Sequence, residues 1–542
     1  MARSLVHGTV FLLIATLITR VLGVVFQIAL RHMTDDAVIG MYTDAVYIYN
    51  IVHIIATAGI PVTISKFIAE QLERKDLYSV NRTFRAAMSI LFLTAGFAAI
   101  LFWFGAPYLP ALNGLDDSVH ILSLTILLVP PLSVLRGYFQ AHQRMEPTAV
   151  SQIVEQIVRI IFMIVVVNQL KQMGSSREIL SAGSMSGALG GAFVAFLLLV
   201  VWYRKERQPI TYTPISVRSV PSYLYRSRSR ERAPLMTIAY KLIKHTWPIT
   251  LVAVAQPLLQ TIDTFSFEYL LPETGIPKTE FHIKTQAGIY RRGDPYVNAM
   301  NILATALAIN LIPTLARHSA KNRQNLIRRT IEQTWSTITM SSLPMATMIA
   351  LLAPHLVTII AKDPRGSFFL AILVTAGIFG NVSLVSSSIL QGLGYNRIPI
   401  RHLLFAIALK LSGNFALIPY LGGVEGAAWA TLIAYAIQCG LNVGYIIREK
   451  KLSPNLRNII VKPILCTTVM SLILFVPLLF LENSLPFPHK KMYDCIIVLS
   501  IGCLGLFIYM GMIFRLKMIT KENILSFPLG KKIISKWDKL WG

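Results

Sequence analysis

Charged side chains are scarce in this sequence. They make up 14% of its 542 residues, whereas 54% are hydrophobic. A soluble domain carries about 25% charged residues. The composition therefore excludes an ordinary soluble protein and predicts an all-α polytopic membrane protein.

Cysteines are few as well. The four are Cys439, Cys466, Cys495 and Cys503, and none forms a CxxC pair. Neither a disulfide framework nor a zinc site is indicated. A cleavable signal peptide is also missing: the apolar segment Gly8–Leu30 is too long for one and has no Ala-x-Ala exit. We expect it to be a retained first transmembrane helix.

Catalytic motifs are lacking too. The sequence has no GxxxxGK[ST] phosphate loop, no HExxH and no GxSxG. The longest predicted external loop, Leu271–Asp294, is too short for a catalytic domain. We therefore predict a protein that is not an enzyme, with no catalytic residue, metal or cofactor. A monovalent cation or the membrane potential stays open as the energy source.

Long apolar segments dominate what is present. A spanning helix needs about 20 apolar residues, and we expect about fourteen spans. They lie near residues 8–30, 41–64, 86–109, 119–139, 149–169, 179–203, 246–271, 294–316, 335–360, 367–391, 399–420, 424–447, 461–481 and 492–515.

The net charge of +25 follows this topology. Most Lys and Arg residues fall in alternate loops, near 66–85, 136–144, 204–244, 317–329, 397–401, 448–462 and 515–539. By the positive-inside rule we expect a multi-pass membrane protein with both termini in the cytoplasm. The basic loops then set orientation and attract anionic membrane lipids, and no nucleic-acid partner is expected.

An internal repeat divides the chain. The same offset separates Gln140 from Gln391 and Arg159 from Lys410, each pair in a similar sequence context. This predicts an N-lobe of six spans (1–203), a C-lobe of six spans (245–447) and two further spans (448–515). A basic cytoplasmic linker (204–244) and tail (516–542) complete the chain. Repeats of this kind place a binding site between the halves, here around a central cavity.

Arg20 is the only charged residue between Gly8 and Leu30. A charge at that depth costs roughly 2.5–3.5 kcal/mol on insertion scales. Helical spacing gives it one face with Thr16, Gly23, Gln27 and Arg31. A guanidinium binds phosphate oxygens bidentately, so the stripe predicts an anionic ligand. The alternative is that a carboxylate or helix-end carbonyls neutralise Arg20.

Other intramembrane polar residues are candidates for the same chamber. In the second span Asn50 shares a face with His53, and Asp44 lies near the start. Glu155 precedes Arg159 by four residues, an order that favours a salt bridge, although the pair could instead line the cavity. Asp263 could couple a cation or pair with an arginine. The remaining candidates are Arg291, Arg292, Asn298 and Lys410.

Several segments resemble the MurJ/SpoVB-type polysaccharide-lipid flippases of the multidrug/oligosaccharidyl-lipid/polysaccharide exporter superfamily. The likeness rests on TRVLG (19–23), TAGIPVTISKFIAE (57–70), RGYFQ…MEPTAVSQIVEQIVR (136–159), GIYRRGDPYV (288–297) and SILQGLGYNRIPI (388–400).

The resemblance implies fourteen helices in two lobes around a cationic cavity. It matches Arg20 to the family's first-helix arginine. A second arginine expected a turn further along is absent, because Phe26 and Gln27 stand there. The arginine expected after the seventh helix is Arg291 or Arg292.

We therefore expect a flippase that moves an undecaprenyl-pyrophosphate-linked precursor, lipid II, to the outer leaflet in peptidoglycan synthesis. The pyrophosphate would contact Arg20, Arg31 and Arg291 or Arg292. Asp44, Glu155, Arg159, Asp263 and Lys410 are candidates for coupling or gating. Alternatives are a flippase for another lipid-linked polysaccharide, a cation-coupled multidrug exporter, or a glycan polymerase. Cell-wall synthesis proteins are plausible partners.

Overall fold

The structure is a computed structural model. It describes residues 2–57, 64–65, 67–68, 71–72, 77–109, 112, 114–142, 144–206, 254, 257–277, 279–361, 363–452, 454–484, 490–516 and 518.

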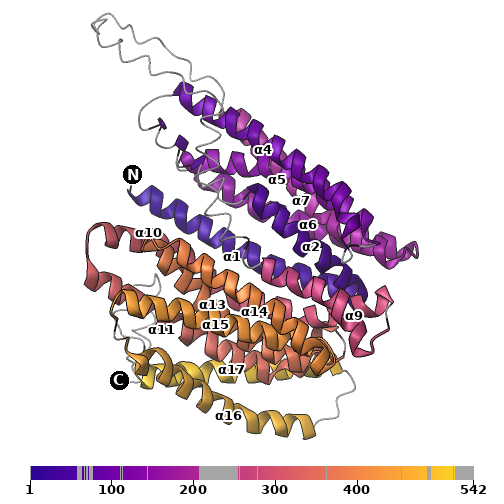
Figure 1. The fold of residues 1–542 in the computed structure, drawn as a ribbon, viewed down its shortest axis with the longest axis vertical. Coiled ribbons are helices and arrows are strands. Elements are labelled where there is room, and N and C mark those ends of the chain that lie inside the picture. The colour runs from indigo at the N-terminus through magenta and orange to yellow at the C-terminus, as the bar shows by residue number, and fades with distance from the viewer. Residues whose placement is uncertain are drawn as a thin grey trace, which may run out of the picture. The chain divides into compact units, whose positions relative to one another are not determined.

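The described residues form helices joined by short turns, with no strand among them (Figure 1). In unit 1 (defined below) the helices are α1 (Ala2–Met33), α2 (Asp36–Thr57), α4 (Leu77–Gly105), η1 (Ala106–Tyr108), α5 (Asp116–Ala141), α6 (Glu146–Gln172), α7 (Arg177–Glu206), a helix over residues 257–270, η3 (Leu271–Thr274) and α9 (Glu280–Tyr290). Then follow η4 (Arg291–Gly293), α10 (Asp294–Ala320), α11 (Gln324–Leu351), α12 (Ala353–Ala361), α13 (Ser367–Gly392), α14 (Arg397–Leu421), α15 (Glu425–Glu449), η5 (Arg457–Val461), α16 (Lys462–Ser484) and α17 (Lys490–Arg515).

Eleven of the described helices are long and apolar enough to cross a membrane, or up to twelve if a bent pair counts as one span. The predicted all-α polytopic fold is therefore confirmed. The count of fourteen stays a prediction, because parts of the predicted spans 41–64 and 246–271 lie outside the described residues.

The predicted span near 335–360 covers parts of two helices, α11 and α12. It is bent by 69° between α11 and α12. Pro354 stands in the first turn of α12 and cannot donate a backbone hydrogen bond, and its ring restricts the residue before it. The break therefore follows from the Leu352–Ala353–Pro354 sequence.

Contacts divide the chain into two compact units. Unit 1 comprises residues 1–291 and 422–424, and unit 2 comprises residues 292–421 and 425–542. The predicted linker 204–244 lies almost wholly outside the described residues. The predicted lobes and their boundaries stay a prediction.

In unit 1, α7 packs along α6 and α5, while α1 lies against α6 and α2 against α9. The α6–α7 contact depends on glycines. Gly187 and Gly191 are four residues apart on α7, and a Cβ on either would lie 2.4–2.5 Å from a backbone carbonyl oxygen of α6. Small residues at this spacing let membrane helices approach closely. The two carbonyls belong to Arg159 and Glu155, so this contact fixes the backbone that carries both predicted site residues.

In unit 2, α13 packs between α10, α11 and α15, and α14 lies along α15. Helices α16 and α17 pack on each other and on the bent α11–α12 pair, around a core that includes Leu352, Met470 and Ile501.

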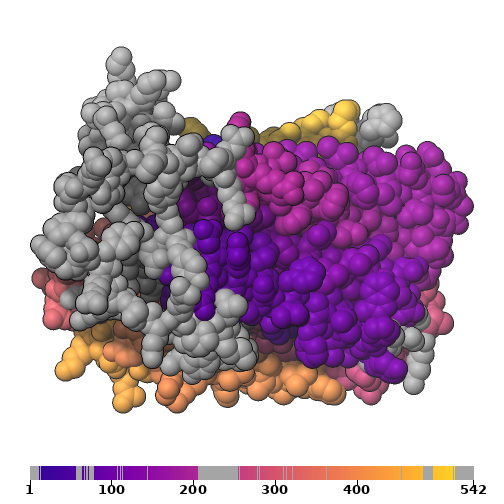
Figure 2. Space-filling model, turned by 90° about the horizontal axis from the view of Figure 1, so that it is seen from above, coloured from indigo at the N-terminus to yellow at the C-terminus, as the bar shows by residue number. Residues whose placement is uncertain are grey.

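Many large apolar side chains remain exposed in both units, among them Leu93, Phe97 and Phe507. Figure 2 shows how closely the side chains of the N-terminal helices, coloured indigo to purple, pack at the surface. Exposed apolar surface on this scale would make a soluble protein prone to aggregation. It is what a lipid-facing surface requires.

The glycine contact gives a stability prediction. We expect Gly187→Ala to lower stability by about 1–3 kcal/mol, because the new methyl group forces α6 and α7 apart. Thermal unfolding of the detergent-solubilised protein measures it. Gly96→Ala in α4 is the matched control: the space around Gly96 is open, with no atom within 4 Å of where the new methyl group would stand, and alanine favours helix. Equal melting temperatures for the two variants would contradict the close contact.

Candidate functional site

The central part of α1 presents Arg20 on an exposed surface. Within the described part of the chain, Arg20 has no hydrogen-bond or ion-pair partner, and no atom lies within 4 Å of a Cβ placed on neighbouring Gly23. This face of α1 is therefore not covered by another described element of unit 1. The alternative of a neutralising carboxylate finds no support among the described residues.

The other end of the same stripe is buried. Gln27 is half-buried, and Arg31 is 8% exposed. The Arg31 Nη2 atom donates a hydrogen bond of 2.6 Å to the backbone oxygen of Arg291. Two of the predicted anion-binding arginines are thus neighbours within unit 1.

Arg291 lies in η4 and is 2% exposed. Its Cζ atom is 4.4 Å from the centroid of the Tyr47 ring on α2, and its Nη2 atom donates to Thr264 Oγ1 at 3.2 Å. The adjacent Asp263 accepts a hydrogen bond of 3.3 Å from the Tyr290 hydroxyl. The structure therefore brings the predicted residues Asp263 and Arg291 into one buried polar group that joins α2, η4 and the helix over 257–270.

Arg292 is directed elsewhere. In unit 2 it donates to both carboxylate oxygens of Asp363, at 2.6 Å and 3.1 Å, and to the backbone oxygen of Arg365 at 2.6 Å. Burial of the Asp363 carboxyl raises its pKa, but the hydrogen bonds from Arg292 and Arg365 outweigh this effect and hold the pKa well below its usual value. Arg292 thus fixes the α12–α13 loop.

Lys284 on α9 is a buried charge that the sequence analysis did not single out. It is 1% exposed, and its Nζ atom lies 3.0 Å from Asp44 Oδ2 and 3.4 Å from Glu268 Oε2. Helices α2 and α9 are in backbone contact here, because a Cβ on Gly40 or Gly288 would overlap a carbonyl of the other helix. The predicted coupling residue Asp44 is therefore half of a buried ion pair.

The expected Glu155–Arg159 salt bridge is wrong. Glu155 Oε2 accepts from Arg136 Nη2 at 2.7 Å, and Arg136 also donates to Ser151. The packing of α6 on α5 brings Arg136 to this carboxylate. Arg159 instead extends towards α1 and α2, with its Cζ atom 5.2 Å from the Phe26 ring centroid and Nη2 3.4 Å from the Tyr42 hydroxyl.

The remaining predicted residues are more scattered. Asn50 on α2 and Asn298 on α10 are half-buried, and Lys410 on α14 is 2% exposed within unit 2. The ring of His53 stacks on Tyr49 at 5.5 Å, as a packing residue would. The sequence analysis also missed the His355–Asp494 pair, which joins α12 to α17 at 2.7 Å. Long-range pairs of this kind leave no local sequence signal.

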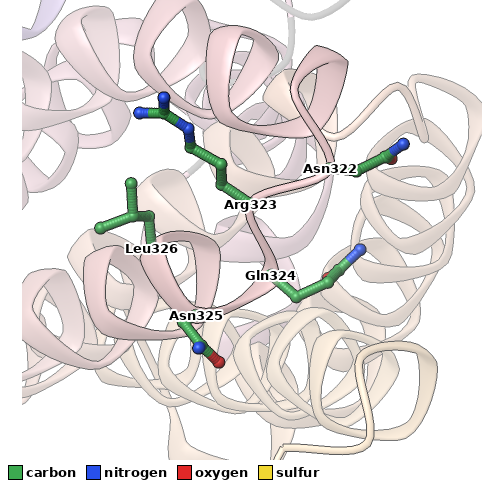
Figure 3. Close-up of a pocket in the computed structure, with 5 residues that line it drawn as sticks. All are labelled: Asn322, Arg323, Gln324, Asn325 and Leu326. Carbon is green, nitrogen blue, oxygen red and sulfur yellow. The ribbon is translucent and has the colours of Figure 1, made fainter.

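A pocket of about 420 Å³ lies away from these residues, at the turn between α10 and α11 (Figure 3). It is lined by Asn322, Arg323, Gln324, Asn325 and Leu326. No predicted site residue is among them. No group of three His, Cys, Asp or Glu side chains in the described part of the chain is arranged to hold a metal ion.

The Asp44–Lys284 pair gives a second prediction. Lys284→Met leaves a buried carboxylate without its cation, so we expect a loss of about 3–5 kcal/mol in stability. The double variant Asp44→Asn/Lys284→Met should recover part of that loss, since the buried charge is removed too. Thermal unfolding compares them with Arg177→Met, which breaks the exposed Arg177–Asp35 pair and should cost about 0–1 kcal/mol. If Lys284→Met is no worse than Arg177→Met, the buried pair does not stabilise the α2–α9 contact.

The Arg292–Asp363 pair gives a pH prediction. Because the pKa of folded Asp363 lies below its unfolded value of about 3.9, the pair stabilises the fold fully above that value and loses its effect as the pH falls below it. The difference in melting temperature between wild type and Asp363→Asn should therefore be the same at pH 8 and pH 5.5. A difference that vanishes already at pH 5.5 would show that the carboxylate is not held by the arginines.

Comparison with known proteins shows which family the chain resembles. The pattern of the Polysaccharide biosynthesis protein family matches residues 5–319. The chain is 26% identical to the Lipid II flippase MurJ of Bacillus subtilis (strain 168), over 96% of this chain and 97% of that protein. It is 30% identical to Stage V sporulation protein B of the same organism, over 38% of this chain and 40% of that protein.

Solved structures show the same fold. The inward closed conformation of the Lipid II flippase MurJ superposes with a TM-score of 0.64 at 13% identity, covering 94% of this chain and 100% of that one. An inward-facing multidrug resistance MATE family transporter gives 0.60 at 12% identity, covering 80% and 94%. MurJ is a flippase and the MATE protein a transporter, and neither is an enzyme, in agreement with the predicted class. The chain is thus a multi-pass membrane protein of the MurJ/MATE-like fold, and it belongs to the Polysaccharide biosynthesis protein family.

Proposed function

We propose that this protein is a flippase for a polyprenyl-pyrophosphate-linked glycan, with lipid II as the substrate. Support comes from the family membership and from the similarity to the MurJ flippase of Bacillus subtilis along nearly the whole chain. In this role it moves the precursor from the inner to the outer leaflet of the bacterial cytoplasmic membrane during peptidoglycan synthesis.

The observation that carries the proposal is the state of Arg20. It lies in the middle of a membrane-spanning helix, on an exposed face, and no described carboxylate neutralises it. A guanidinium in hydrocarbon is costly, so its presence favours a function that uses the charge. Its planar fork matches the oxygens of a pyrophosphate.

The other arginines divide into supporting roles. Of the two candidates we assign Arg291, not Arg292, to the same anion-binding site as Arg20. Arg291 lies in unit 1 together with α1, and its backbone oxygen accepts a hydrogen bond from Arg31. Arg292 is held by Asp363. The pyrophosphate would contact Arg20, with Arg31 and Arg291 adding positive potential from behind it. The glycan would fill the polar chamber while the polyprenyl tail stays in lipid, and alternating access of the two halves would move the head group.

The membrane potential or a monovalent cation would supply the energy for transport. The membrane potential acts on the net charge of the loaded site at about 2.3 kcal/mol per charge per 100 mV. In this scheme transport runs towards the outer leaflet. A monovalent cation would act through Asp44, Glu155 or Asp263. Each of these carboxylates already accepts a hydrogen bond from another side chain, so cation binding would require that contact to change.

A cation-coupled multidrug exporter is the rival with a specific observation behind it, since a MATE transporter has the same fold. Such an exporter would use carboxylates to bind its cationic cargo. In unit 1 the buried carboxylate of Asp44 and the partly buried one of Glu155 face Lys284 and Arg136, whereas the charge left over on α1 is positive. This balance favours an anionic substrate.

Depletion and complementation test the proposal. Cells depleted of the protein should accumulate lipid II on the cytoplasmic side, and wild-type protein should restore export. Arg20→Ala should fail to complement although its level in the membrane is normal, and Arg20→Lys should complement only partly, because lysine keeps the charge and loses the fork. Arg177→Ala, at an exposed arginine of α7, is the control and should complement fully.

Depletion tests the flippase proposal, and complementation by Arg20→Ala tests the role of Arg20. Normal precursor export after depletion would rule out the flippase proposal. Full complementation by Arg20→Ala would leave the flippase standing and remove Arg20 from the binding site.

A further inference from the structure

The guanidinium of Arg159 reaches across from α6 to the surface of α1. Its Cζ atom lies over the Phe26 ring at 5.2 Å, and its Nη2 atom faces the Tyr42 hydroxyl of α2 at 3.4 Å. Three helices of unit 1 thus meet around this one charge. Phe26 is buried, and Arg159 as a whole residue is half-buried.

The charges around Arg159 do not balance. Two guanidinium groups, Arg136 and Arg159, share the neighbourhood of one carboxylate, Glu155. Arg136 holds that carboxylate at 2.7 Å and is fixed by Ser151 as well. Among the described residues the direct partners of the Arg159 guanidinium are therefore the neutral Phe26 ring and Tyr42 hydroxyl, and one positive charge is left over inside the membrane-spanning part of unit 1. A surplus of this kind is stabilised when an anion binds.

The backbone that carries Arg159 is closely packed. The carbonyl oxygens of Arg159 and Glu155 lie 2.4 Å and 2.5 Å from where a Cβ of Gly187 and Gly191 would stand, so α7 packs directly on this turn of α6. A guanidinium supported in this way is held ready for a ligand, which lowers the entropy lost on binding.

Helices α1 and α6 also carry buried hydrogen-bond acceptors that have no partner among the described residues. The amide oxygens of Gln27, next to Phe26 on α1, and of Gln152, on the same face of α6 as Arg159, are buried without a partner in the described part of the chain. Buried polar atoms normally have partners. Hydroxyl groups of a sugar would supply the missing donors.

The level of Phe26 along α1 relates this site to Arg20. Phe26 follows Arg20 by six residues, which is about 9 Å along the helix axis. In the predicted orientation it is nearer to the outer leaflet. It is also the level at which α1 carries Phe26 and Gln27 instead of an arginine. At this level the positive charge comes instead from Arg159 of α6, which lies over the Phe26 ring.

We propose that Arg159 forms a second anion-binding subsite for the pyrophosphate of the lipid-linked substrate, further along α1 than Arg20. This inference rests on the proposed function. Arg20 and Arg159 are then two successive stations for the same group as it crosses the membrane. Arg159 is a binding residue in this scheme and not the coupling or gating residue named as a candidate from the sequence.

Binding of three probes to the full-length protein in lipid nanodiscs tests the proposal. Farnesyl pyrophosphate carries the anion and a prenyl tail, inorganic pyrophosphate carries the anion alone, and farnesol carries the tail alone. We expect Arg159→Leu to weaken farnesyl pyrophosphate binding at least tenfold and to leave farnesol binding unchanged. Arg159→Lys should lose about three- to fivefold, because it keeps the charge without the fork.

A relocated arginine provides the sharper test. The double variant Phe26→Arg/Arg159→Leu places the guanidinium on α1 at the same level, and it should bind farnesyl pyrophosphate within about threefold of wild type. A purely structural role for Arg159 predicts no such rescue. Arg177→Leu is the matched control, since Arg177 also stacks on a phenylalanine ring, Phe281, at an exposed position, and it should bind like wild type.

The outcomes are distinct. Unchanged affinity for farnesyl pyrophosphate in Arg159→Leu, while Arg20→Ala weakens it, would overturn the subsite and leave the flippase proposal intact. Equal weakening of farnesol binding, or no rescue by the relocated arginine, would also overturn it. Wild-type protein that binds farnesyl pyrophosphate no better than farnesol would contradict the proposed function itself. If Arg159→Leu also weakens the binding of inorganic pyrophosphate, the subsite recognises the anion by itself. If Arg159→Leu weakens only the binding of farnesyl pyrophosphate, the subsite recognises the anion when it is attached to its lipid.

Discussion

The cost of a charge in hydrocarbon is the constraint on which the rest of this structure depends. Every ionised side chain in the membrane-spanning helices needs a counter-charge, a polar partner or a ligand. Lys284 meets this need through Asp44, and Arg136 through Glu155. Among the described residues Arg20 has neither a counter-charge nor a polar partner, and Arg159 has the Tyr42 hydroxyl as a polar partner but no counter-charge of its own. The polar interior of unit 1 is therefore organised around paired charges that hold helices together and positive charges that remain for an anion.

Close helix packing is what makes this arrangement specific. Glycines let α2 approach α9 and let α7 approach α6 until backbone atoms meet. Because the backbones are in contact, the side chains that project beside them have few alternative positions. The Asp44–Lys284 pair and the turn carrying Glu155 and Arg159 both lie at such contacts. Small residues thus act on the candidate site indirectly, by fixing the elements from which its charged groups extend.

Much of the candidate site could be anticipated from local patterns. Isolation in an apolar segment identified Arg20, and helical spacing placed Gln27 and Arg31 on its face. The same reasoning failed for Glu155 and Arg159, because spacing of four residues within one helix says nothing about competing partners on a neighbouring helix. Arg136, twenty-three residues before Arg159 in sequence, takes the carboxylate. Lys284 was passed over because its partner Asp44 is distant in sequence.

The sequence by itself determined the class of protein and the position of its intramembrane charges, since long apolar segments and isolated arginines are local properties that hydrocarbon penalises or permits residue by residue. Only the tertiary structure decided which charges are neutralised. Arg291 and Arg292 are adjacent and chemically identical, yet one lies over Tyr47 and the other is bound by Asp363. The physical reason is that neutralisation requires two groups within about 4 Å, and it is the packing of helices and loops that brings residues distant in sequence, such as Asp44 and Lys284 or Arg292 and Asp363, that close.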